Sequence, residues 1–250
     1  MLNLVVDIGN SRTKVAVFNR GELMIHFPVD RLLPKDIRML KEEYPGLTKA
    51  ILSSVKDPQP ELMDCLRNEF GFFVNLDATT PLPIDNCYQT PETLGKDRIA
   101  AAVGANHLYP NQHVLVIDAG TAITYDYVND RNQYKGGFIT PGLSMRFKAL
   151  NHFTDRLPLL SPSFTEKPIG LSTETSIQGG IQLGLMGEIR QIVEYFNIFQ
   201  EDLCIILTGG DHFYFEKWLK NYKFVALEIT LLGLNTIVEF NYMKSKKDNL

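Results

Sequence analysis

The sequence predicts an α/β protein made of two similar halves. Strand-like and helix-like segments alternate along residues 2–109, which is typical of a layered α/β core. A strand, a polar turn containing glycine and a returning strand near the N-terminus recur in the middle of the chain, at residues 113–128. We therefore expect an N-terminal domain over residues 1–113 and a C-terminal domain over residues 114–250.

The N-terminal half begins with a predicted β-hairpin. Residues 2–6 are an apolar run that ends at Asp7, and residues 14–18 are a second run after a polar turn. Another strand is expected at residues 49–55. A proline-rich loop follows at residues 79–95. Apolar residues at helical spacing predict helices at residues 34–44, 57–70 and 96–109.

The C-terminal half repeats the hairpin. Aligning Asp7 with Asp118 places Gly9 on Gly120, and hydroxyl residues follow soon after both. A third apolar strand, which starts at residue 203, ends in Thr-Gly-Gly-Asp at residues 208–211. Three strand-to-glycine turns could converge on one ligand. Residues 177–196 predict a helix, and the tail from residue 244 is expected to be solvated.

The composition excludes several classes of partner. The chain of 250 residues has a net charge of −4 and a pI of about 5.8, so no overall basic field would hold nucleic acid or an anionic membrane. No apolar run is long enough to cross a membrane, and the start lacks the features of a signal peptide. Three widely spaced cysteines, without histidines at metal-ligand spacing, indicate a reducing compartment and no zinc site. We expect a cytoplasmic protein.

The first turn has the groups that bind a phosphate chain. Gly9 lets backbone N–H groups approach, Asn10 and Ser11 offer donors, and Lys14 supplies a cation. Asp7 would repel phosphates unless a metal intervenes, so it most plausibly orients Mg²⁺. The turn is neither a Walker A loop nor a Rossmann fingerprint, because both motifs are absent. The alternative is a plain hairpin with a polar turn, which the repeat disfavours.

The second turn has a similar composition. Asp118 suits a cation, and Thr121 is placed to donate to a phosphate oxygen. Asp126 lies on the same predicted hairpin and is equally well explained as a functional or as a structural carboxylate.

The segment GKDR joins the proline-rich loop to the helix at residues 96–109. Asp97 and Arg98 are therefore expected at the helix N-terminus, where an anion is stabilised. An arginine here can form a fork with a carboxylate or phosphate, and an aspartate can accept a proton from a substrate hydroxyl. The alternative is a capping aspartate beside an arginine that faces solvent.

Four motifs together resemble one family of kinases. They are Asp-Ile-Gly-Asn-Ser-x-x-Lys at 7–14, Gly-x-Asp-Arg at 95–98, Asp-x-Gly-Thr-Ala-x-Thr at 118–124 and Gly-Gly-x-Ile-x-Pro-Gly at 136–142. The two hairpins are shared by the whole superfamily of acetate kinases, sugar kinases, Hsp70 and actin. The other two motifs narrow the resemblance to type III pantothenate kinase, over residues 1 to about 210.

The resemblance implies a fold, an activity and an assembly. The fold would be a pair of ribonuclease-H-like domains of the actin-like ATPase type, and the assembly a homodimer. The activity would be ATP-dependent phosphorylation of pantothenate to 4′-phosphopantothenate, the first step of coenzyme A biosynthesis. The implied cofactors are ATP, Mg²⁺ and a monovalent cation, K⁺ or NH₄⁺.

The resemblance also assigns roles residue by residue. The catalytic base falls on Asp97, the monovalent-cation ligand on Asp118, and a further nucleotide contact on Thr121. Where the family commonly has a small residue and an Asn-Thr pair, this chain has Lys96 and Ser172-Thr173. The nucleotide-phosphate loop falls on Asp7, Ile8, Gly9, Asn10, Ser11, Arg12, Thr13 and Lys14. The pantothenate contacts fall on Tyr88, Gly95, Lys96, Asp97, Arg98 and Thr173.

Two other functions remain open from the residues alone. One is another small-molecule kinase of the same superfamily, such as an acetate or sugar kinase, against which Gly-x-Asp-Arg and the proline-rich loop with Tyr88 argue. The other is a non-enzymatic ATP-binding regulator, for whose usual insertions 250 residues leave little room. Consumption of ATP only in the presence of pantothenate would separate them.

Overall fold

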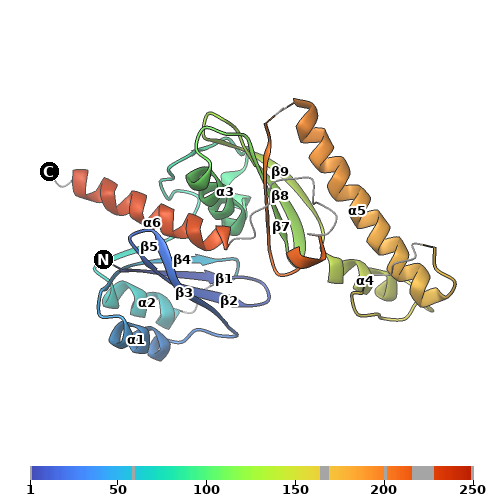
Figure 1. Cartoon of the computed structure of the whole chain (residues 1–250). Helices are drawn as coiled ribbons and strands as arrows, with labels where there is room; N and C mark the ends of the chain where they lie inside the picture. The colour runs from blue at the N-terminus through green and yellow to red at the C-terminus, as the bar shows by residue number, and fades with distance from the viewer. Residues whose placement is uncertain (1, 58–59, 164–168, 200–201, 216–227, 249–250) are drawn as a thin grey trace. The chain divides into compact units, whose positions relative to one another are not determined.

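The computed structural model describes residues 2–57, 60–163, 169–199, 202–215 and 228–248 (Figure 1). The chain forms two compact units. The first unit contains Met1–Asn111, Asp126–Gly136 and Glu228–Leu250, and the second contains Gln112–Tyr125 and Gly137–Leu227. Within the described residues, no helix is both long and apolar enough to cross a membrane.

The first unit is built on a five-stranded sheet in the order β3-β2-β1-β4-β5. β1 pairs antiparallel with β2 and parallel with β4, so it lies in the middle of the sheet. Its residues Leu4, Val5 and Val6 are completely buried, as expected for an apolar run covered on both faces. The strands predicted at 2–6, 14–18 and 49–55 are confirmed. The bounds are β1 Leu2–Ile8, β2 Thr13–Asn19, β3 Glu22–Val29, β4 Leu47–Ser54 and β5 Phe72–Asn75.

Helices cover both faces of this sheet (Figure 1). Leu4 and Val6 point to the core shared with α1 and α2, whereas Val5 points to the core shared with α3 and α6, because successive side chains of a strand alternate between faces. The helices predicted at 34–44, 57–70 and 96–109 are confirmed. Their observed bounds are α1 Pro34–Glu43, α2 Pro60–Glu69 and α3 Lys96–Leu108.

Several elements of the first unit were not predicted, among them β3, β5, β6 and α6. β3 consists mostly of exposed residues. The first half of α6, Ile229–Asp248, is buried and apolar on all sides, so it shows no apolar stripe at helical spacing. α6 packs tightly on α3, since a Cβ on Gly104 or on Gly233 would overlap with backbone atoms of the other helix. The tail predicted to be solvated continues α6 as far as Asp248, and its lysines are exposed.

The second sheet has the order β10-β7-β8-β9-β6. β10 runs parallel to β7, with Thr208 opposite Asp118. β8 and β9 continue along the chain from one unit into the other, and the paired residues of β6 and β9 belong to the first unit. The strands are β6 Asp85–Asn86, β7 Val114–Ala119, β8 Ala122–Val128, β9 Gln133–Pro141 and β10 Cys204–Thr208, and the helices are α4 Leu143–His152 and α5 Thr173–Phe199. The hairpin predicted at 113–128 is confirmed, and the helix predicted at 177–196 lies inside the longer α5.

Candidate active site

The first polar turn connects β1 and β2 in the first unit. Asp7 pairs with Lys14 across the hairpin, and the N–H of Gly9 donates a 3.1 Å hydrogen bond to the carbonyl of Arg12, which closes the turn. Asp7 is buried at the base of the turn, whereas the residues at its tip, 10–12, are exposed. The predicted phosphate-binding residues thus lie at the exposed tip of one hairpin and on the strand ends beside it.

Asp7 is held in an unfavourable environment for a charged carboxylate. Burial raises the pKa of Asp7 to about 6; the Ser53 hydroxyl and Lys14 lower it in part, and Asp97 and Glu228 raise it. The buried Oδ1 of Asp7 has no hydrogen-bond partner among the described residues. A buried carboxylate oxygen without a partner is costly unless a ligand satisfies it. Asp7 and Asp97, predicted for different roles, are therefore electrostatic neighbours.

Lys14 has a partner that the sequence did not indicate. Its Nζ lies 2.6 Å from Oε2 of Glu228, and both side chains are about one third exposed. Glu228 directly precedes α6, 214 residues along the chain. No local pattern could have indicated this pair.

The predicted position of Asp97 and Arg98 at a helix N-terminus is confirmed. Gly95 is the N-cap of α3, and Asp97 accepts a 2.9 Å hydrogen bond from the backbone N–H of Arg98. A Cβ on Gly95 would lie 2.6 Å from Oδ1 of Asp97, so a side chain at this position would displace the carboxylate. Asp97 is half-buried, with Lys96 beside it.

Arg98 does not face solvent. Its side chain is 5% exposed, and its Nε donates a 2.9 Å hydrogen bond to Oδ1 of the completely buried Asp126. Nη2 lies 2.7 Å from the same oxygen, outside hydrogen-bonding angles. The hydroxyl of Tyr134 donates a 2.7 Å hydrogen bond to that oxygen as well. Although burial lowers the pKa of Arg98, the carboxylate of Asp126 more than offsets this and raises it.

Tyr88 extends this cluster. Its ring stacks on Tyr134 with centroids 6.1 Å apart, and Cζ of Arg98 lies 5.8 Å from its centroid. Gly136, the first glycine of Gly-Gly-x-Ile-x-Pro-Gly, has φ +92° and contacts the Tyr88 ring where a side chain would crowd it. Three separate predicted segments thus meet around Arg98.

The second unit brings together the other two glycine turns. The N–H of Gly120 donates a 3.1 Å hydrogen bond to the carbonyl of Ala122, as Gly9 does to Arg12 in the first turn. Gly209, with φ +91°, abuts Asp118, and the N–H of Asp211 donates a 2.9 Å hydrogen bond to the carbonyl of Ala119. The predicted convergence is therefore observed for these two turns, and that of all three stays a prediction.

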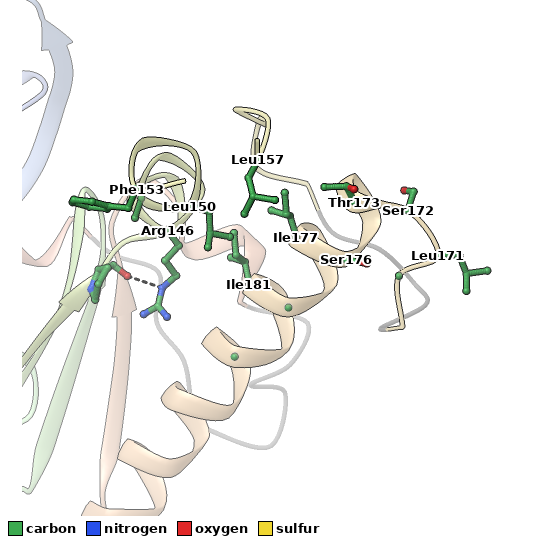
Figure 2. A pocket seen from close by; sticks show the side chains of 15 residues that line it. Arg146, Leu150, Phe153, Leu157, Leu171, Ser172, Thr173, Ser176, Ile177 and Ile181 are labelled. Atoms are coloured by element: carbon green, nitrogen blue, oxygen red, sulfur yellow. Dashed lines mark hydrogen bonds between the residues drawn. The ribbon is translucent and has the colours of Figure 1, made fainter. Parts of the chain in front are cut away.

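Thr121 and Thr173 lie apart from these contacts in the second unit. Thr121 is exposed at the tip of its turn, and its carbonyl accepts a 3.2 Å hydrogen bond from the N–H of Gly142. Thr173 is exposed at the start of α5 and lines an open hollow of about 1240 Å³ along α4 and α5 (Figure 2). Arg146 projects into the same hollow and donates a 2.9 Å hydrogen bond to the carbonyl of Pro141.

No three His, Cys, Asp or Glu side chains gather as a metal-binding group in the part of the chain that the structure describes. A magnesium ion bound mainly by phosphate and water needs only one or two carboxylates from the protein. The buried, unpartnered oxygen of Asp7 fits that role.

The chain is similar in sequence to proteins of known family. The family model described as type III pantothenate kinase matches residues 3–195. A type III pantothenate kinase of Phocaeicola vulgatus is 41% identical over 240 residues, which is 96% of this chain and 99% of that protein.

Solved structures show the fold. A Campylobacter jejuni chain assigned to the Baf family of transcriptional activators has a TM-score of 0.62 at 24% identity, covering 96% of this chain and 99% of that one. The glucokinase of an Antarctic psychrotroph has a TM-score of 0.54 at 11% identity, with 96% and 99% covered. The fold is therefore the predicted pair of ribonuclease-H-like domains found in actin-like ATPases and sugar kinases.

Proposed function

Because the chain belongs to the type III pantothenate kinase family, it transfers a phosphoryl group from ATP to pantothenate, and we propose that the residues around Asp7 and Asp97 carry out this transfer. The product is 4′-phosphopantothenate, the first intermediate of coenzyme A biosynthesis. The observation that carries the proposal is the electrostatic proximity of Asp7, at the base of the phosphate-binding turn, to Asp97, at the start of α3.

The turn from Asp7 to Lys14 would bind the phosphates of ATP. The exposed residues at its tip and Lys14 would offset the negative charge, and positioning and charge neutralisation are the main requirements of phosphoryl transfer. Asp7 would hold Mg²⁺, which would supply positive charge to the phosphates. In the second unit, Thr121 would add a nucleotide contact, and residues 208–211 are the proposed adenine pocket, packed against Asp118 through Gly209.

Asp97 would act as the general base. Its carboxylate would orient the primary hydroxyl of pantothenate and accept its proton late, since an aspartate is far less basic than an alkoxide. The hydrogen bond from the N–H of Arg98 and the absence of a side chain at Gly95 fix the carboxylate. The helix N-terminus stabilises its negative charge.

Pantothenate would bind beside the start of α3. Tyr88, Gly95, Lys96 and Arg98 are the proposed contacts in the first unit, with Arg98 directed at the substrate carboxylate. Thr173 is the proposed contact from the second unit. Its side chain is exposed at the start of α5.

Asp118 would bind a monovalent cation, K⁺ or NH₄⁺. Its carboxylate is half-buried beside the backbone of Gly209 and Ala119, and carboxylate and carbonyl oxygens are ligands for hard cations. Such a cation supplies positive charge near the nucleotide.

We also propose a cytoplasmic homodimer. The hollow along α4 and α5 has open space at Gly180 and Gly184, and Phe153 and Leu171 beside it are strongly exposed. A partner subunit would bury this apolar surface.

The three cysteines are free, which suits a reducing compartment. We also propose a domain boundary near residue 113. It is inferred from the duplicated hairpin, and the two compact units need not coincide with the two domains.

The proposal is tested by ³¹P NMR of the purified protein with Mg-ATP, pantothenate and K⁺. We expect a phosphomonoester signal that requires pantothenate and weakens when Na⁺ replaces K⁺. ADP without the ester would indicate another acceptor or an ATPase, and neither product would indicate a nucleotide-binding regulator. If the ester forms equally well in Na⁺, the proposed monovalent-cation site is wrong, but the proposed kinase activity still holds.

A further inference from the structure

We propose that Asp126 and Tyr134 are positioning residues that orient the guanidinium of Arg98, and that this orientation makes the enzyme selective for a substrate with a carboxylate. The inference rests on the proposed function, because Arg98 is its proposed carboxylate contact. It assigns a role to Asp126, which the sequence left undecided between structure and function.

Three polar groups meet at one oxygen in the first unit. Oδ1 of Asp126 accepts hydrogen bonds from Nε of Arg98 at 2.9 Å and from the Tyr134 hydroxyl at 2.7 Å, and Nη2 of Arg98 lies 2.7 Å away. Asp126 and Tyr134 are completely buried. Since both partners are rigidly packed, they fix the plane of the guanidinium.

The guanidinium keeps donors for a ligand. Arginine has five N–H groups in a planar fork, and Asp126 takes the one on Nε. Nη2 is buried and ion-paired with the same carboxylate at 2.7 Å, outside hydrogen-bonding angles, so its N–H groups are not used in an aligned hydrogen bond to a described residue. A carboxylate in the plane of the fork would satisfy the remaining donors, and that geometry requires a fixed plane.

The location of the cluster connects it to the substrate. The ring of Tyr88, itself a proposed pantothenate contact, lies over the guanidinium with 5.8 Å between its centroid and Cζ of Arg98. Tyr88 is partly exposed, so it forms the boundary between the buried ion pair and solvent. A buried ion pair contributes little net stability relative to apolar residues, so stability alone does not explain Asp126.

The test compares two acceptors, pantothenate and pantothenyl alcohol, in which CH₂OH replaces the carboxylate. Asp126→Asn should raise the KM for pantothenate by about tenfold or more, the equivalent of one charge-assisted hydrogen bond, and change kcat little. The kcat/KM for the alcohol, or its Kd if it is not phosphorylated, should change less than about threefold. Tyr134→Phe should raise the KM for pantothenate by about fivefold, the equivalent of a neutral hydrogen bond.

The matched control is Glu239→Gln, which disrupts the ion pair between Lys49 and Glu239 in the same unit, at 2.6 Å. Glu239→Gln should leave the ratio of kcat/KM for pantothenate to kcat/KM for the alcohol unchanged. When Arg98 is already replaced by lysine, Asp126→Asn should raise the KM for pantothenate little further, because Asp126 acts through Arg98.

Two results would overturn the inference. One is an unchanged acceptor ratio in folded Asp126→Asn and Tyr134→Phe proteins, and the other is an equal fall in kcat for both acceptors, which would assign the cluster to scaffolding of Asp97. If the wild type forms no ester with pantothenate, the proposed function fails first and this inference fails with it. If the wild type is active and the Asp126 and Tyr134 variants lose their preference for pantothenate over the alcohol, both the proposed function and this inference are supported.

Discussion

The ammonium group of Lys14 lies 2.6 Å from the carboxylate of Glu228, so the cation of the proposed phosphate-binding turn already has a counterion. Glu228 also raises the pKa of Asp7, together with burial and Asp97. If the turn binds the nucleotide phosphates as proposed, they would compete with Glu228 for the same positive charge.

Replacing Glu228 with glutamine should strengthen ATP binding. The pair is about one third exposed, and such pairs contribute up to about 1 kcal/mol, so we expect a Kd for ATP up to about fivefold lower. Isothermal titration with a non-hydrolysable ATP analogue measures this change. Glu61→Gln, on the exposed side of α2, is the control. Weaker binding in Glu228→Gln would mean that Glu228 positions Lys14 instead of competing for it.

Replacing Asp97 with asparagine should remove the base and keep the fold. We expect turnover to fall by at least about 100-fold, the lower end of general-base contributions, with the Kd for ATP nearly unchanged. Coupled-enzyme kinetics and nucleotide titration measure the two quantities. The exposed Asp64→Asn on α2 controls for loss of one negative charge. Near-normal turnover would assign the base to another residue.

Replacing Asp7 with asparagine should stabilise the protein and inactivate it. Folding raises the pKa of Asp7 from 3.8 to about 6, so the folded state holds a proton that the unfolded state has lost between these pH values. The free energy of unfolding therefore falls as pH rises from about 4 to 6, by at most about 3 kcal/mol. Asp7→Asn avoids this cost.

Urea denaturation at pH 4 and pH 7 tests this sign. The variant should exceed the wild type in unfolding free energy at pH 7, and the difference should shrink towards pH 4. Mg-ADP should raise the Tm of the wild type more than that of the variant, because the variant lacks the proposed magnesium ligand. An equal shift in both proteins would remove Asp7 from metal binding.

Replacing Gly184 with arginine should separate the proposed dimer without unfolding its subunits. A Cβ at Gly184 meets nothing within 4 Å, and arginine favours a helix over glycine by about 0.8 kcal/mol. We expect monomers of unchanged or higher Tm by light scattering and thermal denaturation. Gly184→Ala, which adds little volume, should remain dimeric. A dimer in the arginine variant would place the interface elsewhere.

Local patterns were sufficient to predict most of the fold. The apolar run before Asp7 and its recurrence before Asp118 predicted both hairpins, because strand and turn preferences are expressed within a few neighbouring residues. The same holds for the placement of Asp97 at the start of α3. α6 and β3 were missed, since one lacks an apolar stripe and the other lies exposed at the sheet edge.

The sequence by itself determined which chemical groups are present and on which local elements they lie: a carboxylate at the base of a polar hairpin turn, and an acid and an arginine at a helix start. Only the tertiary structure decided their partners. Arg98 is buried against Asp126, and Lys14 meets Glu228 across 214 residues of chain. Such pairings depend on how strands and helices pack, which local hydrophobic periodicity does not encode.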